Sequence, residues 1–309
     1  MRKADWMAGN YGIMVHFVPN LKPRYSGGGL DFNQMADGFD VKNFVSEVKA
    51  MGGKWILFPF GQNIIGYWSY NAVIEKYLPG VCSKRDLVLE IAIEAKRQGL
   101  RFIAYLHTSY DECTEEFRNA FGWNLSSDKK VFMERWTAAM RYYSEKFGDL
   151  LDGWWFDACY RSKEKSFLKT HDWDNSRFDE DKWFEAARAG NQNRITAMCD
   201  GANQMTYVFE QEEYLAGESS RTLEFYPWDY DSTEKQWHAL ICTDCFWGHC
   251  EREGEIDPPK FTDDEMCEYT KTCLEKRGAI TWNVGIYQDS TMAEKTVAQI
   301  KRLKERLGI

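Results

Sequence analysis

The stretch "GWWFDACY", residues 153–160, places two tryptophans and a phenylalanine directly before a single carboxylate, Asp157. A short apolar run of this kind is typical of a strand that is buried on both faces of a parallel sheet. In a parallel α/β barrel the active site lies at the carboxyl ends of the strands. Asp157 is therefore either a reacting group at the end of a buried strand or a residue that forms a turn after it.

Similar apolar runs alternate with amphipathic stretches of helix length along the rest of the chain. They predict strands at 11–17, 54–60, 100–106, 152–157, 194–199 and 278–284, and two more strands within 204–250. Strands that alternate with helices form parallel sheets. The pattern predicts one domain over residues 1–309, a single (β/α)8 TIM-type barrel that is irregular in its second half, and a doubly wound open sheet is the alternative.

Capping residues set the expected starts of several helices. Asp40 precedes apolar positions at helical spacing, and the helix is expected to end at the glycines 52–53. A Ser or Thr followed three positions later by an acidic residue resembles a capping box, and this pattern occurs at Ser83–Asp86, Thr262–Glu265 and Thr291–Glu294.

The charge and the hydropathy of the chain exclude several classes of partner. The formal net charge is −9, and no cluster of Lys and Arg forms a basic stripe, which argues against binding to nucleic acid or to anionic membranes. No apolar run approaches the ~18 residues of a membrane span. The first ten residues lack the apolar stretch of a signal peptide, so we expect a cytoplasmic protein, although a signal sequence could have been trimmed.

The nine cysteines are scattered and odd in number, which fits reduced thiols better than a disulfide framework. The run "CTDCFWGHC" places Cys242, Cys245 and Cys250 beside His249, and this spacing could supply zinc ligands. A structural zinc site usually needs a second pair of cysteines, which the chain lacks. We therefore expect no metal and no cofactor, and keep a zinc-stabilised protein as an alternative.

Polar side chains next to the buried runs are the candidates for chemistry, because in a parallel barrel such groups converge on one mouth. The candidates are His16, Gln62, Asn63, Tyr105, His107, Asp157 and Arg194. A carboxylate beside Trp155 suits a nucleophile that approaches the anomeric carbon of a sugar. Apolar surroundings would raise the pKa of Asp157 unless hydrogen bonds or a cation such as Arg194 offset the loss of hydration. For His16, a buried histidine bonded to backbone is an equal alternative.

Four of the quoted segments, taken in order, resemble the catalytic barrel of the α-L-fucosidases, glycoside hydrolase family 29. They are "YGIMVHF" (11–17), "FDVKNFVSEVKAMGGKWILF" (39–58), "SKRDLVLEIAIEAKRQGLRFIAYLH" (83–107) and "DGWWFD" (152–157). The later half is similar more loosely, through "AGE", "FWG" and "GAITWNVGI". The resemblance implies a retaining exo-glycosidase, in which an aspartate attacks C1 to form a covalent glycosyl-enzyme and a second carboxyl group acts first as acid and then as base.

The resemblance also implies roles for individual residues. Asp157 falls on the family's nucleophile, and Trp155 falls on the aromatic residue that lines the sugar. His16 falls on a histidine that bonds sugar hydroxyls, Tyr105 lies near a tyrosine that follows the third strand, and Arg194 matches an arginine after the nucleophile.

Two departures from the family bear on the substrate and on the domains. The family usually carries two adjacent histidines after the second strand, which grip the axial hydroxyl of fucose, whereas this chain has Gln62 and Asn63 in "FPFGQNIIGYW". The sugar is therefore L-fucose or one of similar configuration. The family usually adds a C-terminal β-sandwich, for which we expect no room in 309 residues.

The acid/base residue is expected in the second half of the chain. Glu218 in "YLAGESS" (214–220) is the first choice, because it follows a short apolar run and because Gly217 would let the backbone approach a substrate. Glu213 and Glu224 are the reserves. The alternatives are a catalytically inactive barrel that binds carbohydrate and a glycosidase of different sugar specificity. The expected partner is a glycan or small glycoside, and the sequence does not indicate an oligomeric state.

Overall fold

The computed structural model describes residues 2–62, 66–108, 113–159, 178–229 and 235–309. The strands in these ranges are β1 (Asn10–Met14), β2 (Trp55–Pro59), β3 (Arg101–His107), β4 (Gly153–Asp157), β5 (Ile195–Met198), β6 (His238–Cys242) and β7 (Ala279–Asn283). The α-helices are α1 (Phe32–Gly38), α2 (Val41–Ala50), α3 (Ala72–Tyr77), α4 (Leu87–Arg97), α5 (Glu115–Phe121), α6 (Lys130–Phe147), α7 (Glu180–Ala187), α8 (Asp263–Glu275) and α9 (Glu294–Leu307). Two short 3-10 helices span Gly148–Leu150 and Pro227–Asp229.

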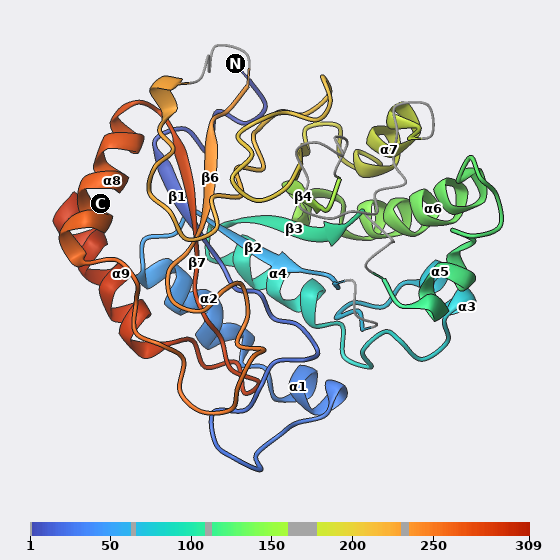
Figure 1. Cartoon of the computed structure of the whole chain (residues 1–309), viewed down its shortest axis with the longest axis horizontal. Coiled ribbons are helices and arrows are strands. Elements are labelled where there is room, and N and C mark those ends of the chain that lie inside the picture. Colours follow the sequence, from blue (N-terminus) through green and yellow to red (C-terminus); the bar gives the residue numbers. More distant parts are fainter. Residues whose placement is uncertain (1, 63–65, 109–112, 160–177, 230–234) are drawn as a thin grey trace.

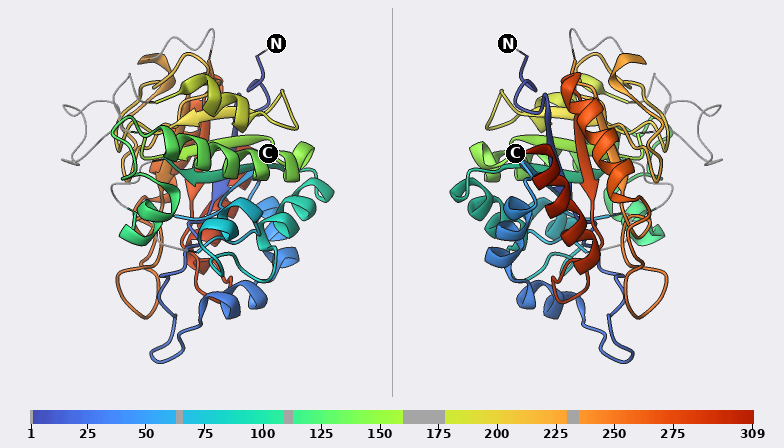
Figure 2. Two further views of the ribbon diagram at one scale, coloured as in Figure 1. Left: turned by 90° about the vertical axis from the view of Figure 1, so that its right-hand side faces the viewer. Right: turned by 90° about the vertical axis from the view of Figure 1, so that its left-hand side faces the viewer.

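The seven strands form one parallel sheet in the order β5-β4-β3-β2-β1-β7-β6, and helices lie around its outer side (Figure 1). Figure 2 shows the same arrangement from two sides, with α8 and α9 together on one flank. All strand pairs are parallel, so every carboxyl end lies at the same edge of the sheet. The six strands predicted individually are confirmed, but β1 ends at Met14, so His16 lies in the loop that follows it.

An irregular segment, residues 213–220, lies between the two edge strands of the sheet. The Glu213 N–H donates to the Thr196 carbonyl oxygen in β5 at 3.0 Å, and the Leu240 N–H in β6 donates to the Gly217 carbonyl oxygen at 2.7 Å. The segment makes only isolated bridges with the strand region beside it. Of the two strands predicted within 204–250, one is confirmed as β6, and the rest of the described part of that range holds this segment in place of a second regular strand.

Glycine is required at one position of the 213–220 segment. Gly217 has a φ of +61°, and a Cβ atom there would lie 1.9 Å from the backbone oxygen of His238. No other residue could let the segment approach β6 so closely. The sequence predicts that Gly217 lets a substrate approach the backbone, but the group that lies against Gly217 is the backbone of β6.

The sheet buries apolar side chains on both faces, which explains why its strands are nearly continuous apolar runs. The outer face packs against the helices in a large aromatic and aliphatic core. The inner face carries a second cluster that includes Trp55, Ile103, Tyr105 and Trp155. Trp55 fills the interior beside β1, where a Cβ atom on Gly12 would lie 2.2 Å from its ring. Much of the aromatic content is therefore core.

The helix caps agree with the sequence in two of the four predicted cases. Asp40 accepts a hydrogen bond from the Asn43 N–H at 3.0 Å at the start of α2, and Thr262 and Glu265 form a full capping box on α8. No side-chain cap forms on α4 or α9. At α4, the Asp86 carboxylate is instead bound by Ser69 and Lys146, so tertiary contacts replace the local cap.

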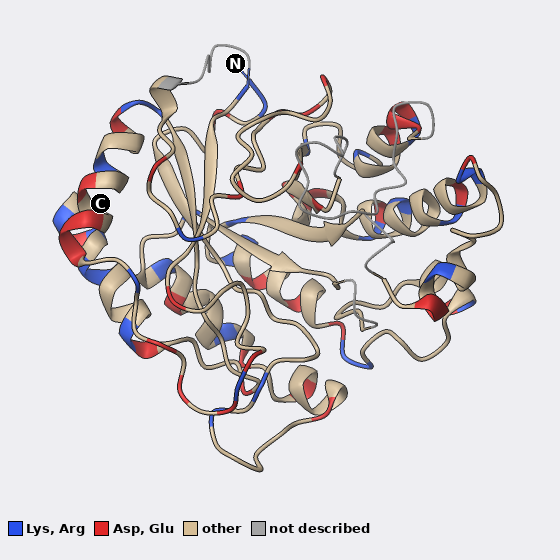
Figure 3. Ribbon diagram, in the orientation of Figure 1, with Lys and Arg blue, Asp and Glu red and all other residues tan. Residues whose placement is uncertain are grey.

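Charged side chains of both signs are interspersed over the outer helices, while the strands are almost uncharged (Figure 3). This is the distribution expected of solvated helix faces around a buried sheet. Within the described ranges, no helix combines the length and the apolar character needed to cross a bilayer.

Candidate active site

A cavity of about 190 Å³ lies at the carboxyl ends of the strands. Six of the side chains singled out from the sequence line it: His16, Gln62, Tyr105, Trp155, Asp157 and Glu218. They come from four strands or the loops after them and from the 213–220 segment. The prediction that distant polar residues converge on one mouth is therefore confirmed for His16, Gln62, Tyr105 and Asp157.

Asp157 is the last residue of β4, and its side chain is fixed by two donors. The Tyr105 hydroxyl donates to its Oδ2 atom, and the Ala158 N–H donates to its Oδ1 atom at 2.8 Å. Ala158 has a φ of 59°, in the left-handed region that residues with a side chain rarely adopt. This backbone conformation costs of the order of 1 kcal/mol and is typical of functional sites. Asp157 is thus held in place rather than left in an ordinary turn.

The charge state of Asp157 is balanced between burial and hydrogen bonding. Burial raises the pKa of the Asp157 carboxyl group, whereas hydrogen bonds from Tyr105, the Ala158 N–H and Cys199 lower it. The groups that shift the pKa of Asp157 include no positively charged side chain of the described residues. The tendency to protonate is therefore opposed by neutral donors and not, as the sequence suggested, by Arg194.

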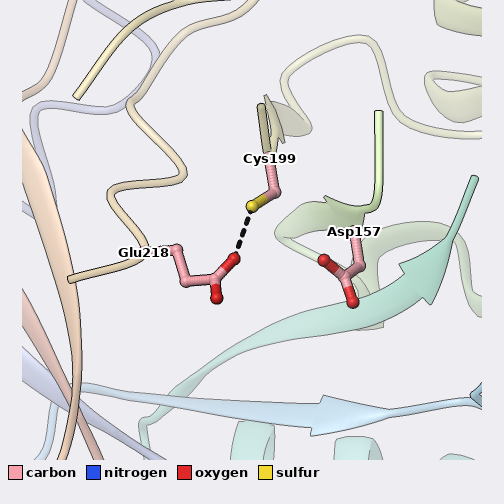
Figure 4. Close-up of side chains that lie close together, drawn as sticks. All are labelled: Asp157, Cys199 and Glu218. Carbon is pink, nitrogen blue, oxygen red and sulfur yellow. Dashed lines mark hydrogen bonds between the residues drawn. The ribbon is translucent and has the colours of Figure 1, made fainter. Parts of the chain in front are cut away.

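Glu218 faces Asp157 with the thiol of Cys199 beside both carboxylates (Figure 4). The Cys199 Sγ atom donates to Glu218 Oε2 at 2.8 Å. One carboxylate oxygen of Asp157, the Sγ atom of Cys199 and one carboxylate oxygen of Glu218 all lie within 4.8 Å of one another. The arrangement brings two carboxylates to the same small cavity.

The two reserve glutamates lie elsewhere. Glu213 is paired with Arg188 at 2.8 Å and accepts hydrogen bonds from Thr196, near the start of β5. Glu224 is exposed and does not line the cavity. Of the three glutamates considered from the sequence, Glu218 alone reaches the cavity.

Two buried polar atoms at the cavity are available to a ligand. His16 Nδ1 and Gln62 Oε1 have no hydrogen-bond partner among the described residues. Burial lowers the pKa of His16 to about 4, so its ring is neutral near pH 7 and offers one donor and one acceptor. Buried polar atoms normally find partners, and the hydroxyl groups of a sugar would supply them. Asn63 lies outside the described residues.

Aromatic rings form one wall of the cavity. Trp155 stacks on Tyr105 with 5.4 Å between ring centroids, and its Nε1–H donates to the Ala216 carbonyl oxygen at 2.9 Å. Trp247 and the half-exposed Phe246 also line the cavity. Apolar ring faces of this kind suit a pyranose, and Trp155 is the aromatic residue that the resemblance predicts beside the sugar.

Sequence reasoning missed three residues of the site. Phe246 and Trp247 belong to the "FWG" match, which was the available signal for them. Cys199 directly follows β5, as Asp157 ends β4, so its position already placed it at the carboxyl edge. It was passed over because a buried cysteine usually behaves as a small apolar residue.

The prediction that His107 contacts a substrate is not supported. His107 is buried and does not line the cavity. Its Nε2 atom is 3.1 Å from the Tyr67 hydroxyl, and its ring packs 5.2 Å from that of Trp136. At the end of β3 the side chain enters the aromatic core, because the helices cover that face of the sheet.

The prediction that Arg194 binds substrate or offsets the charge of Asp157 is wrong. Arg194 precedes β5, so it lies at the amino end of the sheet, opposite the cavity. It is fully buried, and its guanidinium donates to five backbone carbonyl oxygens, those of Leu151, Ala187, Ala189, Ser144 and Gly148. All five of its N–H groups are used, which makes it a structural cation that satisfies loop carbonyls.

Replacing Arg194 with methionine is expected to lower the free energy of unfolding by ~3–5 kcal/mol, because five buried carbonyl oxygens lose their donors. Urea denaturation followed by circular dichroism measures the change. Arg306→Met is the matched control, since Arg306 is exposed in a surface ion pair and its loss should cost under ~1 kcal/mol. Equal unfolding midpoints for Arg194→Met and wild type would contradict the structural role.

The cysteine-rich run 242–250 does not gather its ligand atoms. His249 Nε2 is 2.9 Å from the Gly254 carbonyl oxygen, and the Cys242 Sγ atom accepts a hydrogen bond from Asn283 at 3.6 Å. Among the described residues, the one group of three or more potential metal ligands with close donor atoms is Asp157, Cys199 and Glu218. A cation could thus bind at the cavity, but the zinc hypothesis for the 242–250 run is not supported.

Comparisons with known proteins identify the family and the fold. The sequence matches the family model described as Alpha-L-fucosidase over residues 4–305. A search of curated proteins finds no match.

Several solved structures share the fold. The endo-fucoidan hydrolase MfFcnA4 from glycoside hydrolase family 107 aligns with a TM-score of 0.70 at 16% identity, covering 99% of this chain and 53% of that chain. The alpha-L-fucosidase AlfC from Lactobacillus casei, in complex with alpha-L-fucose, has a TM-score of 0.66 at 14% identity and coverages of 99% and 98%. Alpha-L-fucosidase isoenzyme 1 from Paenibacillus thiaminolyticus has a TM-score of 0.68 at 15% identity, with coverages of 98% and 74%.

The chain spans about half of the MfFcnA4 chain but nearly all of AlfC. These structural likenesses show the fold, and the family match over nearly the whole chain shows the relationship. The chain belongs to the alpha-L-fucosidase family and is a glycoside hydrolase by that membership.

Proposed function

We propose that this protein is a retaining, exo-acting glycoside hydrolase that removes a terminal α-L-fucose, or a sugar of similar configuration, with Asp157 as nucleophile and Glu218 as acid/base. The observation that carries the proposal is the pair of carboxylates at one cavity, with oxygens within 4.8 Å of each other. Retaining enzymes hold their carboxyl groups ~5–5.5 Å apart, whereas inverting enzymes need ~6.5–9.5 Å to admit a water molecule. The spacing therefore favours the retaining mechanism.

In the first step Asp157 attacks C1 of the sugar while Glu218 protonates the leaving oxygen. In the second step Glu218 removes a proton from water, which attacks C1 and releases Asp157. The Tyr105 hydroxyl and the Ala158 N–H keep the Asp157 carboxylate oriented toward the cavity. His16 Nδ1 and Gln62 Oε1, which have no partner in the described part of the chain, would bind hydroxyl groups of the sugar, and Trp155 and Trp247 would pack on its apolar face.

For the sheet we infer that the 213–220 segment takes the place of the eighth strand of a (β/α)8 barrel. The hydrogen bonds of this segment to β5 and to β6 support the inference, because they connect the two open edges. Glu218 would then occupy the position that the carboxyl end of a strand supplies elsewhere.

Fucose is the first choice of sugar because the fold relatives act on fucose-containing compounds. AlfC has been solved with alpha-L-fucose and, as a variant, with Fuca(1,6)GlcNAc, and several structures of the same fold are endo-fucoidan hydrolases. The second candidate is therefore an endo-acting enzyme on a fucose polymer. A glycosidase of different sugar specificity remains the third, because Gln62 and Asn63 stand where the family usually carries two histidines.

Assays with aryl glycosides, including α-L-fucoside and β-galactoside, and with a fucan polysaccharide test the proposal. We expect hydrolysis of the aryl α-L-fucoside, with retention of configuration seen by proton NMR of the first-formed sugar. Products from the polysaccharide alone would favour the endo-acting candidate. Binding of fucose without hydrolysis of any substrate would indicate the catalytically inactive carbohydrate-binding barrel and reject the proposal.

Chelators are expected to leave hydrolysis unchanged, because the proposed mechanism uses the carboxylates of Asp157 and Glu218 directly. Added Zn²⁺ should inhibit, since those carboxylates and the Cys199 thiol offer it three ligands. Rates after dialysis against EDTA, and then with added zinc, measure both effects. Cys199→Ser should weaken the inhibition. Loss of activity in EDTA that zinc restores would instead show a metal-dependent enzyme.

Replacing Tyr105 with phenylalanine should move the acidic limb of the kcat/KM pH profile to higher pH. Asp157 must be ionised to attack, and the Tyr105 hydroxyl donates to the ionised form, so its loss raises the pKa of Asp157. Activity is then lost first on the acidic side. Tyr11→Phe is the control, because its buried hydroxyl bonds to the Met51 carbonyl oxygen far from the cavity. An acidic limb that does not move in Tyr105→Phe would contradict the role of Asp157.

A further inference from the structure

We propose that Cys199 is a positioning residue for Glu218: its thiol donates to Oε2 and thereby fixes the orientation of the carboxyl group for proton transfer. The inference rests on the proposed function, since it assigns a role within that reaction. Cys199 is buried and does not line the cavity, so it acts through Glu218 and not by touching substrate.

The geometry that supports this is a short contact between two buried groups. The Sγ atom lies 2.8 Å from Glu218 Oε2, and the Gly201 N–H donates to the same sulfur at 3.4 Å. The second contact is local, because Gly201 lies two residues after Cys199 in the loop that follows β5. Figure 4 shows the thiol directed at one oxygen of Glu218 and the other oxygen turned away from it.

The thiol remains a donor throughout the working range of pH. Burial raises the pKa of Cys199 well above its usual value, and the nearby charges of Glu218 and Asp157 raise it further. An S–H group has a single proton, so one carboxylate oxygen can receive it fully at a time. The Cys199 thiol also helps to lower the pKa of Asp157, but its short hydrogen bond goes to Glu218 Oε2, while Asp157 accepts from the Tyr105 hydroxyl and the Ala158 N–H.

The titratable groups around this pair come from several elements. Asp157 ends β4, Tyr105 lies in β3, and His16, in the loop after β1, packs edge-on against Tyr105 at 5.1 Å. Cys242 of β6 also lies near Glu218, whose negative charge helps to raise the pKa of the Cys242 thiol. No Lys or Arg of the described residues appears among the groups that shift the pKa of Cys199 or Asp157.

The hydrogen bond from Cys199 to Glu218 serves both steps of the proposed reaction. When the sugar is transferred to Asp157, the O–H bond of Glu218 breaks and the proton goes to the departing oxygen, while the C1–oxygen bond breaks and the bond from Asp157 to C1 forms. When water attacks C1, its proton goes to Glu218 and the bond to Asp157 breaks. The S–H bond of Cys199 stays intact throughout, and its hydrogen bond is strongest while Glu218 is ionised.

The test compares Cys199→Ala and Cys199→Ser on two aryl α-L-fucosides, one with a poor leaving group and one with a good one. With the poor leaving group, Cys199→Ala should lose ~10-fold or more in kcat, because an acid that is not oriented transfers its proton less well. With the good leaving group, the first step should be nearly unchanged. Cys199→Ser keeps a donor and should restore most of the lost rate.

The pH profile gives a second readout. A donor to the ionised form of Glu218 makes it a stronger acid, so its loss in Cys199→Ala should move the basic limb of kcat/KM to higher pH, and Cys199→Ser should move it back. Cys273→Ala removes a buried thiol of α8 and serves as control. A purely structural role would lower the rate equally for both leaving groups and leave the basic limb in place, and that result overturns the inference.

Infrared spectroscopy separates failure of this inference from failure of the proposed function. The S–H stretch of Cys199, isolated as the difference between wild type and Cys199→Ser, should shift to higher frequency in Glu218→Ala, where its acceptor is gone. If the wild type is active and the S–H band does not shift in Glu218→Ala, the hydrogen bond from Cys199 to Glu218 is rejected. If the wild type hydrolyses no glycoside, the proposed function is rejected. The catalytic role of the hydrogen bond is then rejected as well, even if the S–H band shifts.

Discussion

Asp157→Ala should hydrolyse an aryl α-L-fucoside ~10⁴-fold or more slowly than wild type, because the variant lacks the oxygen that bonds to C1. The fold should survive, since the side chain ends a strand and its neighbours Trp155 and Phe156 supply the packing. The backbone oxygen of Asp157, which accepts from the Thr108 N–H at 2.8 Å, is unaffected. The loss should therefore appear in kcat and not in the unfolding midpoint.

A small external nucleophile offers a stricter form of this prediction. Azide can enter the space left by the carboxylate, so it should restore part of the rate in Asp157→Ala and yield a glycosyl azide of inverted configuration. Asp37→Ala, an exposed aspartate on α1, serves as the control and should retain full activity. Full activity of Asp157→Ala would rule out its role as nucleophile.

Glu218→Ala should lose ~10²–10⁴-fold in kcat with a poor leaving group and far less with an activated one such as a dinitrophenyl glycoside. A good leaving group departs without a proton, so the first step no longer needs the acid. The second step still needs a base, and glycosyl-enzyme should therefore accumulate with the activated substrate, visible as a burst of released phenol.

The control for Glu218 is Glu224→Ala, which removes an exposed carboxylate six residues further along the chain. It should behave as wild type with both substrates. An equal loss of rate for good and poor leaving groups in Glu218→Ala would show that Glu218 is not the acid, and another carboxyl group would then have to take that role.

The regular part of the fold could be predicted from the sequence because it rests on local patterns. Buried parallel strands such as β4 are continuous apolar runs, and α2 and α8 carry their own capping residues. The 213–220 segment could not be predicted in this way, because its shape depends on a close approach to β6 that only Gly217 permits. The predicted cap of α4 failed for a related reason, since the tertiary contact of Asp86 with Lys146 overrides the local motif.

Within the site, position relative to a strand decided which predictions held. Asp157 ends a strand and lies at the cavity, whereas Arg194 precedes one and lies at the opposite end of the sheet. His107 ends a strand but its side chain enters the outer core, and the direction of a side chain at a strand end is not encoded in apolar periodicity. Cys199 shows the reverse case, because residue type hid a side chain whose position was informative.

The most direct test of the account is the identity of the residue that bonds to the sugar. A 2-deoxy-2-fluoro-fucosyl fluoride reacts slowly in both steps, and more slowly in the second. The glycosyl-enzyme therefore accumulates and can be digested for mass spectrometry. We predict one label, on the peptide that contains Asp157, and no label in Asp157→Asn. An active enzyme whose label lies on any other residue, or which turns over with no covalent intermediate, would contradict the central claim.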